Sequence, residues 1–291
     1  MNTPNAVLAL HDLSCFGRSA LQVIIPSLTS FGLLTCPVPT AVLSTHTGGF
    51  EDFTFYDLSQ HMKAQLYHWQ TLDLSFQAIY PGFLGSSEQV SIVKDYIKAY
   101  KKEETLLLVD PVLGDEGRKY TSITDTLVEE MRELISGSDY ITPNLTEANL
   151  LLNKPAHKIP EEKDYANYLT SLSQLGTKNV LITSIDHSKK NKMTLLYYDS
   201  QNDLAYKLLL PKVPATYPGT GDIFCSLLIG HLLNQEAIQT ALLKTTSFLY
   251  RTIAHTYEKN TPHREGLLVE PFLAKRSHYE QVLPNLKFQR L

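Results

Sequence analysis

Short apolar runs alternate with longer segments of helical periodicity along nearly the whole chain. Residues 7–10 and 105–109 are uninterrupted apolar or β-branched runs, which is typical of strands buried on both faces. In residues 86–101, by contrast, apolar side chains recur every three to four positions, which is typical of a helix with one buried face. Strands that alternate with helices form parallel sheets covered by helices. The pattern therefore predicts an α/β fold with a central, mainly parallel sheet and helices on both faces.

The same pattern sets the expected elements. Strands are predicted at residues 7–10, 38–43, 78–80, 105–109, 140–142 and 180–183, with an antiparallel hairpin at residues 193–198 and 204–210. Helices are predicted at residues 19–31, 57–72, 86–101, 124–135, 146–152, 161–175, 220–233 and 237–257. No Gly/Ser-rich linker, low-complexity tract or internal repeat interrupts this order. A single domain over residues 1–291 is therefore expected.

The composition excludes several classes of protein. Of the 291 residues 43% are hydrophobic, and 26 basic against 30 acidic side chains give a formal net charge of −4. Nucleic acid is not an expected partner, because polyanion binders carry clustered excess Lys and Arg. The three cysteines show no zinc or disulfide spacing, and no apolar stretch reaches the ~20 residues of a transmembrane helix. A cytoplasmic protein without a membrane partner is expected.

Polar side chains gather directly after the predicted strands, where ligands bind in open α/β sheets. The most informative of these segments is Gly219-Thr220-Gly221-Asp222, which opens an apolar helix. Glycines admit the close approach of a ligand, and the N-terminus of a helix presents N–H groups to an anion. The spacing matches neither the dinucleotide fingerprint nor the phosphate-binding loop G-x-x-x-x-G-K-[ST]. Taken alone, Asp222 has an equally good structural explanation, because a carboxylate in the first turn of a helix interacts favourably with the helix dipole.

Four motifs together resemble those of a known superfamily. Residues 219–222 (GTGD) resemble the G-x-G-D anion-hole motif of ribokinase-like kinases. Residues 110–115 (DPVLGD), 142–147 (TPNLTE) and 44–48 (STHTG) resemble motifs of the pyridoxal kinase branch, in that branch's order and spacing. The resemblance implies a three-layer α/β sandwich without a separate lid domain. It also implies ATP-dependent phosphorylation of the 5'-hydroxymethyl group of a vitamin B6 vitamer, namely pyridoxal, pyridoxamine or pyridoxine.

By this resemblance Asp222 is the base that contacts the substrate and accepts its hydroxyl proton. The backbone N–H groups of Gly219, Thr220 and Gly221 correspond to the anion hole for the charge that develops during phosphoryl transfer.

The resemblance also places ATP and Mg²⁺ beside acidic groups. Asp110, Asp115 and Glu147 correspond to the carboxylates that surround the metal ion and the ATP phosphates, directly or through water. The other residues expected to bind ATP are Thr142, Asn144, Thr183, Ser184, Val213, Tyr217, Thr220 and Gly221.

The residues expected to bind the vitamer depart from the usual pattern of the branch at two places. Asp12 and the residue after it stand where many pyridoxal kinases have Ser-His, and Phe83 stands where Tyr is usual. His46 and Thr47 match the pattern. An ionised carboxylate accepts but does not donate a hydrogen bond, and Phe keeps the stacking surface of Tyr without the phenol. These differences favour pyridoxamine or pyridoxine over pyridoxal.

Three other functions stay open. A hydroxymethylpyrimidine kinase of thiamine synthesis shares the fold and the chemistry, although that branch often carries Gly-Cys-Thr where this chain has Gly221-Asp222-Ile223. A sugar kinase is suggested by Thr47-Gly48-Gly49, but such enzymes insert a β lid where this chain continues into a helix. A non-catalytic ligand-binding protein would have no need of Asp222. Lidless relatives tend to be homodimers, so a homodimer is expected, whereas the preferred vitamer and activation by K⁺ stay open.

Overall fold

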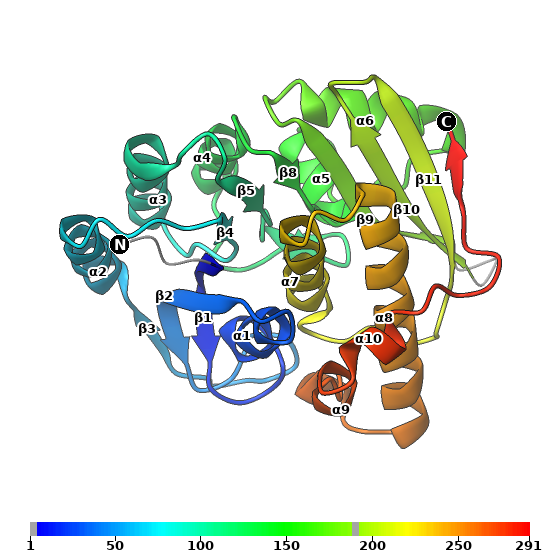
Figure 1. The fold of residues 1–291 in the computed structure, drawn as a ribbon, viewed down its shortest axis with the longest axis horizontal. Coiled ribbons are helices and arrows are strands. Elements are labelled where there is room, and N and C mark those ends of the chain that lie inside the picture. Colours follow the sequence, from blue (N-terminus) through cyan, green and yellow to red (C-terminus); the bar gives the residue numbers. More distant parts are fainter. Residues whose placement is uncertain (1–4, 188–191) are drawn as a thin grey trace. The chain divides into compact units, whose positions relative to one another are not determined.

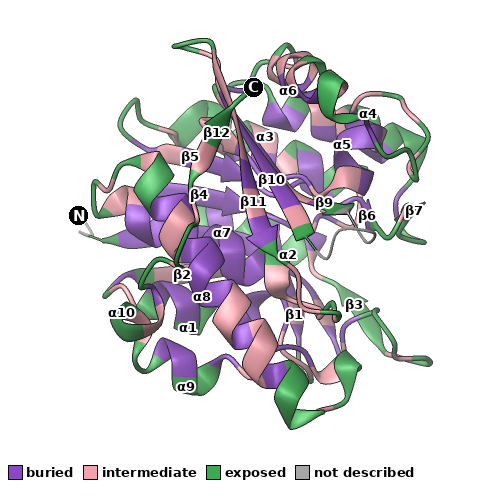
Figure 2. Ribbon diagram, turned by 90° about the vertical axis from the view of Figure 1, so that its right-hand side faces the viewer, coloured by how far each residue is buried: buried purple, intermediate pink, exposed green. Residues whose placement is uncertain are grey.

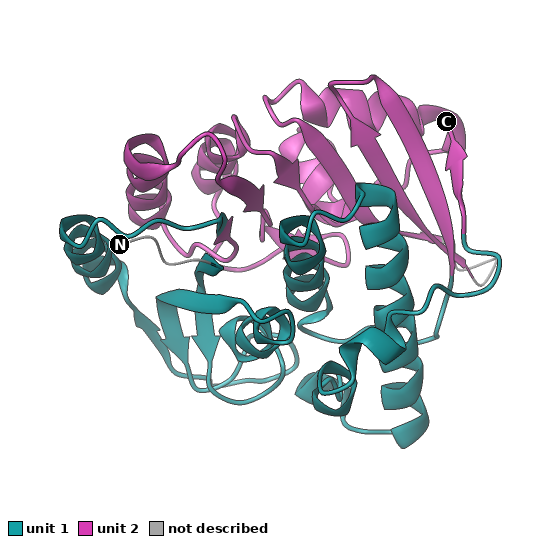
Figure 3. Ribbon diagram, viewed as in Figure 1, with its two compact units in different colours: residues 1–79, 211–286 teal, residues 80–210, 287–291 magenta. Residues whose placement is uncertain are grey.

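The computed structural model describes residues 5–187 and 192–291, and its contacts group the chain into two compact units (Figure 3). Unit 1 comprises residues 1–79 and 211–286, and unit 2 comprises residues 80–210 and 287–291. Unit 1 is therefore built from an N-terminal and a C-terminal part of the chain. The single-domain organisation expected for residues 1–291 stays a prediction. No helix in the described ranges is both long and apolar enough to span a membrane.

The sheet of unit 1 is centred on β1 (Ala6–Ser14), which pairs in parallel with β2 (Leu34–Leu43). The short β3 (Phe55–Asp57) pairs antiparallel with β2, and α1 (Leu21–Thr29) packs on both β1 and β2 (Figure 1). α2 (Ser59–Thr71) packs on β2.

The predicted end of the first strand is wrong. β1 runs on to Ser14 instead of stopping at residue 10, because His11 and Asp12 are buried and the chain continues to pair with β2. The polar side chains that the sequence places after the strand therefore lie within it.

The helical layer of unit 1 is built around α7 (Thr220–Leu233), whose bounds match the prediction. Residues 222–231 are all buried, and Figure 2 shows α7 as one of the most continuously buried helices. α7 packs on α1 and on α8 (Ile238–Lys259). The chain then continues through three short helical segments. These are a 3₁₀ turn (His263–Glu265), α9 (Glu270–Leu273) and α10 (Arg276–Tyr279).

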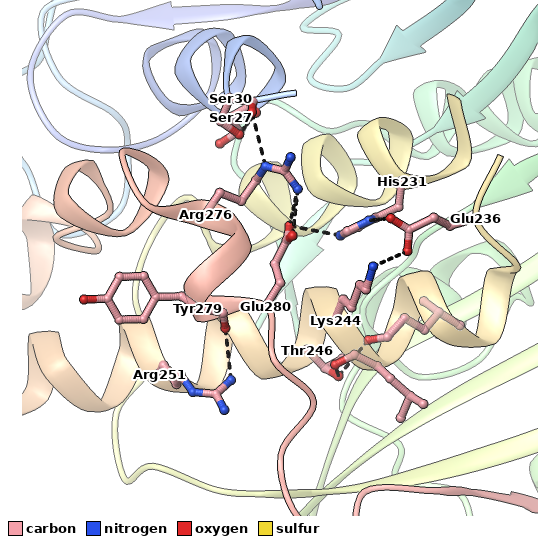
Figure 4. Close-up of polar contacts among 12 residues, drawn as sticks. Ser27, Ser30, His231, Glu236, Lys244, Thr246, Arg251, Arg276, Tyr279 and Glu280 are labelled. Atoms are coloured by element: carbon pink, nitrogen blue, oxygen red, sulfur yellow. Dashed lines mark hydrogen bonds and ion pairs between the residues drawn. The ribbon is translucent and has the colours of Figure 1, made fainter. Parts of the chain in front are cut away.

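A buried ionic network ties the residues around α10 to the end of α7 (Figure 4). His231 Nε2 lies 3.0 Å from Glu280 Oε1, and His231 Nδ1 lies 3.1 Å from Glu236 Oε1. Arg276 donates to both carboxylate oxygens of Glu280 at 2.7 Å, and Lys244 donates to Glu236 at 2.6 Å. Burial raises the pKa of Glu280, but His231 and Arg276 outweigh burial and hold that pKa below its ordinary value. The network therefore holds the last helix of unit 1 against α7.

Unit 2 has a mixed sheet with the strand order β4-β5-β8-β9-β10-β11-β12. β5, β8 and β9 pair in parallel, whereas β9 with β10 and β11 with β12 are antiparallel. The strands are β4 (Ala78–Pro81, shared with unit 1), β5 (Leu106–Val109), β8 (Tyr140–Ile141), β9 (Asn179–His187), β10 (Lys192–Asp199), β11 (Leu204–Pro211) and β12 (Phe288–Arg290).

Four α-helices of unit 2 correspond to predicted helices. They are α3 (Ser87–Tyr100), α4 (Asp125–Ile135), α5 (Leu145–Leu151) and α6 (Tyr165–Ser173), the last preceded by a 3₁₀ turn (Glu162–Asp164). Ser86 and Thr124 cap α3 and α4 by accepting N–H hydrogen bonds, as polar residues at helix starts do. A small antiparallel hairpin of β6 (Gly114–Asp115) and β7 (Arg118–Lys119) was not predicted.

The predicted fold class is confirmed. The described strands and helices alternate along the chain, the interior strand pairs are mainly parallel, and an antiparallel hairpin of β10 and β11 follows β9 as predicted. The strands that the pattern missed are β3, β6, β7 and β12, each of only two or three residues, and the four-residue helices α9 and α10 were not predicted either. Strands this short leave no measurable periodicity in a sequence.

Candidate active site

The turn before α7 accepts only glycine at its first position. Gly219 is the N-cap of α7 with φ of +79°, and a Cβ added there would lie 2.0 Å from the carbonyl oxygen of Arg18. Thr220 Oγ1 donates to the carbonyl oxygen of Tyr217 at 2.7 Å, which fixes the turn. The first N–H groups of a helix have no acceptor within it and lie at the positive end of its dipole. The turn from Gly219 to Gly221 therefore suits a phosphoryl group.

The Asp222 carboxylate is buried in the first turn of α7 and both of its oxygens have partners. The Ala20 N–H donates to Oδ2 at 2.7 Å, and His11 Nε2 lies 3.1 Å from Oδ1. Ala20 has φ of +53°, a conformation that is costly for a residue with a Cβ. This strained residue at the start of α1 holds its N–H against Asp222.

His11 connects Asp222 to Asp12. His11 Nδ1 lies 2.8 Å from Asp12 Oδ1, and Ser14 Oγ donates to Asp12 Oδ2 at 2.7 Å. Neighbouring residues of a regular strand point to opposite faces. Here the register of β1 with β2 is irregular between His11 and Leu13, so that Asp12 alone faces two residues of β2. The extra residue of this bulge therefore lies in β2, and the Asp12 carboxylate contacts the ring of the preceding His11 beside it.

The charges in this cluster shift the pKa values of both His11 and Asp222. Burial lowers the pKa of His11, but Asp222 and Asp12 outweigh burial and raise that pKa to about 10. Burial raises the pKa of Asp222, but His11, the Ala20 N–H and His46 together hold it below its ordinary value of 3.8. Asp222 is therefore an ionised carboxylate at neutral pH, as a base must be before it accepts a proton.

The loop after β2 carries two of the residues expected to contact the vitamer, His46 and Thr47. His46 is buried, and its Nε2 lies 2.7 Å from the carbonyl oxygen of Arg264. The Gly48 N–H donates to Nδ1 at 3.1 Å, so the proton of the neutral imidazole lies on Nε2. The ring also packs edge-on against Phe50, at 5.0 Å between centroids. His46 thus fixes the loop, which leaves Thr47 exposed.

The segment before the glycine turn holds two of the residues expected to bind ATP. Val213 and Tyr217 are both half-buried. The Tyr217 ring stacks on the His263 ring, with 5.1 Å between centroids and 23° between planes. His263 Nε2 lies 3.3 Å from Thr216 Oγ1. The 3₁₀ turn after α8 therefore supports this segment of unit 1.

In unit 2 the predicted acidic residues follow β5 and start α5. Asp110 is buried, and Thr142 Oγ1 donates to Asp110 Oδ1 at 3.4 Å. Asn144 and Glu147 form a capping box at α5, in which the Glu147 N–H donates to Asn144 at 2.9 Å and the Asn144 N–H donates to Glu147 at 2.8 Å. The Leu113 N–H donates to the other oxygen of Glu147 at 3.2 Å.

These acidic residues form a cluster of negatively charged groups, not a complete metal cage. Burial and the nearby carboxylates of Asp110 and Asp115 raise the pKa of Glu147 well above its ordinary value. Among the described residues, no group of three or more His, Cys, Asp or Glu is arranged to hold a metal ion. Both Glu147 oxygens already accept backbone N–H groups, so Glu147 fits the outer surroundings of a cation. Carboxylate oxygens are nevertheless ligands that suit Mg²⁺.

Two further predicted positions of unit 2 lie at irregular places of the chain. Thr183 and Ser184 stand at the end of the strand predicted for residues 180–183, but that strand runs further, so both lie inside β9. The pairing of β9 with β10 has a bulge there, because these two half-buried residues of β9 lie opposite the single residue Leu195 of β10. Such bulges re-aim side chains. Phe83 is half-buried in the segment after β4.

His11 and Ala20 are the site residues that the sequence did not reveal. His11 is the neighbour of Asp12, and a titratable side chain at the end of an otherwise apolar strand was a signal for it. Ala20 acts through its backbone N–H, which leaves no signal in the sequence.

The fold is that of a ribokinase-like kinase. The chain belongs to the phosphomethylpyrimidine kinase family, whose model matches residues 20–266. The resemblance to ribokinase-like kinases is thereby confirmed.

Individual relatives carry two kinds of name. A putative phosphomethylpyrimidine kinase from Bacteroides thetaiotaomicron, solved in an orthorhombic form with pyridoxal, is 39% identical over 99% of both chains, with a TM-score of 0.91. The pyridoxal kinase from Lactobacillus plantarum is 28% identical, with a TM-score of 0.85 over 95% of this chain and 99% of that one. The pyridoxine/pyridoxal/pyridoxamine kinase of Bordetella avium is 28% identical over 86% of this chain and 85% of its own length.

Proposed function

We propose that this protein transfers the γ-phosphoryl group of ATP to the 5'-hydroxymethyl group of a vitamin B6 vitamer. The observation that carries the proposal is the Asp222 carboxylate, which is buried and ionised at the glycine turn that opens α7. The names of the relatives from Lactobacillus plantarum and Bordetella avium support the substrate class. The proposal makes the protein an enzyme of pyridoxal phosphate salvage.

In this reaction Asp222 accepts the proton of the hydroxymethyl group. The hydroxyl oxygen forms its bond to the γ-phosphorus as the bond between that phosphorus and the β–γ bridging oxygen breaks, which releases ADP. The N–H groups from Gly219 to Gly221 stabilise the charge on the transferred group. Asp12, His46, Thr47 and Phe83 are proposed to contact the vitamer.

We propose that ATP is used with Mg²⁺ at the acidic residues of unit 2. The metal ion would neutralise phosphate charge, and Asp110, Asp115 and Glu147 would hold it directly or through water. Burial is the main cause of the raised pKa of Glu147, and the carboxylates of Asp110 and Asp115, which also raise it, support the assignment because a cation would relieve their repulsion. The proposed ATP contacts are Thr142, Asn144, Thr183, Ser184, Val213 and Tyr217.

A homodimer in the cytoplasm completes the proposal. Cys15 and Cys36 are free thiols, which suits a compartment that keeps thiols reduced. Activation by K⁺ is a further property to measure with the purified enzyme.

Hydroxymethylpyrimidine kinase activity is the second candidate, and the name of the matching family favours it. Both reactions phosphorylate a hydroxymethyl group on a six-membered nitrogen ring, so the geometry around Asp222 serves either one. The residues that contact the ring therefore determine which of the two compounds is phosphorylated, and this preference has to be measured directly.

The test is an ATP-consumption assay with pyridoxal, pyridoxamine, pyridoxine and hydroxymethylpyrimidine, each at the same concentrations. An Asp222→Asn preparation purified in parallel serves as the control for contaminating kinases. We expect kcat/KM to be highest for a B6 vitamer, with pyridoxamine or pyridoxine ahead of pyridoxal. Turnover of hydroxymethylpyrimidine alone would overturn the main proposal in favour of the second candidate, and no turnover of any compound would overturn both.

A further inference from the structure

His11 lies at the centre of a chain of three buried charges in unit 1. One ring nitrogen lies 2.8 Å from Asp12 Oδ1 and the other lies 3.1 Å from Asp222 Oδ1. The side chains of all three residues are at least 88% buried, so solvent screens these charges little. No motif of the sequence analysis assigns a role to His11.

Two contacts compete for Nδ1 of His11. The Asp12 N–H donates to this nitrogen at 3.0 Å when it is unprotonated, and the Asp12 carboxylate lies 2.8 Å away as an acceptor when it is protonated. Ser14 donates to Asp12 and Ala20 donates to Asp222, which keeps both carboxyl groups in the role of acceptors. Burial lowers the pKa of His11, but the two carboxylates outweigh burial and raise that pKa to about 10, which favours an imidazolium between them.

We propose that His11 is a positioning residue for the phosphoryl transfer, which holds Asp222 ionised and in one orientation and is itself held by Asp12. The inference rests on the proposed function for its kinetic part and on the structure alone for its charge state.

The contacts of His11 with Asp222 and Asp12 counteract the effect of burial on the charge of Asp222. A buried carboxylate without a cation takes up a proton and is no longer a base at neutral pH. The imidazolium prevents this, and Asp12 offsets the cost of burying the imidazolium, which leaves the trio with a single negative charge. Ala20 and His11 together also fix the plane of the Asp222 carboxyl group through its two oxygens. His46, when protonated, acts on Asp222 in the same direction.

The charge state is tested without any substrate. Histidine labelled with ¹⁵N is incorporated into the protein, and the His11 resonance is identified by its loss in His11→Gln. We expect the imidazolium signature to persist through pH 8, and the titration midpoint of His11 to fall by about 1–3 pH units in Asp12→Asn and in Asp222→Asn. Glu51→Gln removes an exposed carboxylate of unit 1 and should leave the midpoint unchanged. A wild-type midpoint below pH 7 overturns the proposal.

The kinetic role is tested by the pH dependence of kcat for a vitamer that the wild-type enzyme phosphorylates. His11→Gln keeps a donor of similar size but removes the charge, so Asp222 should bind a proton more readily. We expect the acidic limb of the kcat profile to move up by about 1–3 pH units, and kcat at pH 7 to fall by up to about 100-fold with KM for ATP little changed.

The failure of this inference is distinguishable from failure of the proposed function. A wild-type enzyme that phosphorylates no vitamer removes the proposed function and leaves the ¹⁵N experiment intact. A His11→Gln enzyme that loses kcat while its acidic limb coincides with that of wild type shows that His11 is only structural, and this result overturns the inference.

Discussion

Asp222 is buried, yet it is ionised at neutral pH, because its neighbours stabilise the carboxylate as water would stabilise an exposed one. His11 offers a positive charge and Ala20 offers an N–H, and Asp222 stands in the first turn of α7 where the helix dipole favours a carboxylate. The low pKa of Asp222 makes it a weak base in absolute terms. The advantage of the low pKa is that Asp222 is ionised in nearly every enzyme molecule, and therefore able to accept the proton, when substrate binds.

Replacing Asp222 by Asn tests its role as the base. Asn keeps the size and an acceptor for the Ala20 N–H but does not accept the hydroxyl proton. We expect kcat to fall about 10²–10⁴-fold while KM for ATP changes little, because a general base acts in the transition state. Steady-state kinetics measure both constants, and thermal unfolding checks that the variant is folded. A kcat that stays within about tenfold of wild type would assign the base elsewhere.

The glycine turn and α7 form the element on which the site depends. Gly219 has both a left-handed backbone and the Arg18 carbonyl oxygen within 2.0 Å of the position of a Cβ. Gly32, just after α1 in the same unit, has a similar φ of +75° but no atom within 4 Å of such a Cβ. The two positions therefore separate the cost of the backbone conformation from the cost of the steric contact.

Gly32→Ala should lower the free energy of unfolding by about 1–2 kcal/mol, through the backbone conformation alone, and leave kcat unchanged. Gly219→Ala must in addition displace the turn from Arg18. We expect a larger loss of stability and a fall of about 10²-fold or more in kcat, because the N–H groups of the turn lose their alignment. Urea unfolding and steady-state kinetics on both variants measure the difference. Equal effects of the two substitutions would mean that the close contact at Gly219 does not matter.

The sequence predicts elements well where the pattern is long and local. The bounds of α7 agree at both ends, and the Asn144 and Glu147 positions of the TPNLTE motif prove to be a capping box. The sequence pattern predicts poorly those structural features that depend on contacts between residues far apart in the chain. His11 and Asp222 are 211 positions apart and meet only in the folded chain, as their numbers and the ion pair show. The bulges at Asp12 and at Thr183 and Ser184 likewise come from strand pairing.

Unit 1 joins two distant parts of the chain, and α7 is held at both ends. Its start meets β1 and the residue before α1 through Asp222, and its end meets α10 and the following residue through His231. Close packing supports the same region, since a Cβ at Gly230 would lie 2.4 Å from the Phe31 ring. A helix restrained at its far end keeps its N-terminal turn in place. The C-terminal network therefore contributes to the geometry of the site.

Replacing Glu280 by Gln tests this network with little change of shape. The substitution leaves Arg276 and His231 without their carboxylate in a buried place, so the free energy of unfolding should fall by about 3–5 kcal/mol. Glu133→Gln is the control, because it breaks an exposed ion pair with Lys94 and should cost about 1 kcal/mol or less. Urea unfolding at pH 7 compares the two. A loss as small as that of the control would show that Glu280 contributes no more than a surface charge.

The difference in unfolding free energy between wild type and Glu280→Gln should change with pH in one direction, which the lowered pKa of Glu280 sets. His231 and Arg276 outweigh burial and hold the pKa of folded Glu280 below its ordinary value of 4.5. Ionisation of Glu280 therefore stabilises the fold above pH 4.5, and this contribution is lost as the pH falls through the lowered pKa. We expect the stability gap between wild type and Glu280→Gln to be constant from pH 7 to about pH 5 and to narrow in more acidic solution. A gap that widens towards acid would mean that Glu280 is protonated in the folded protein.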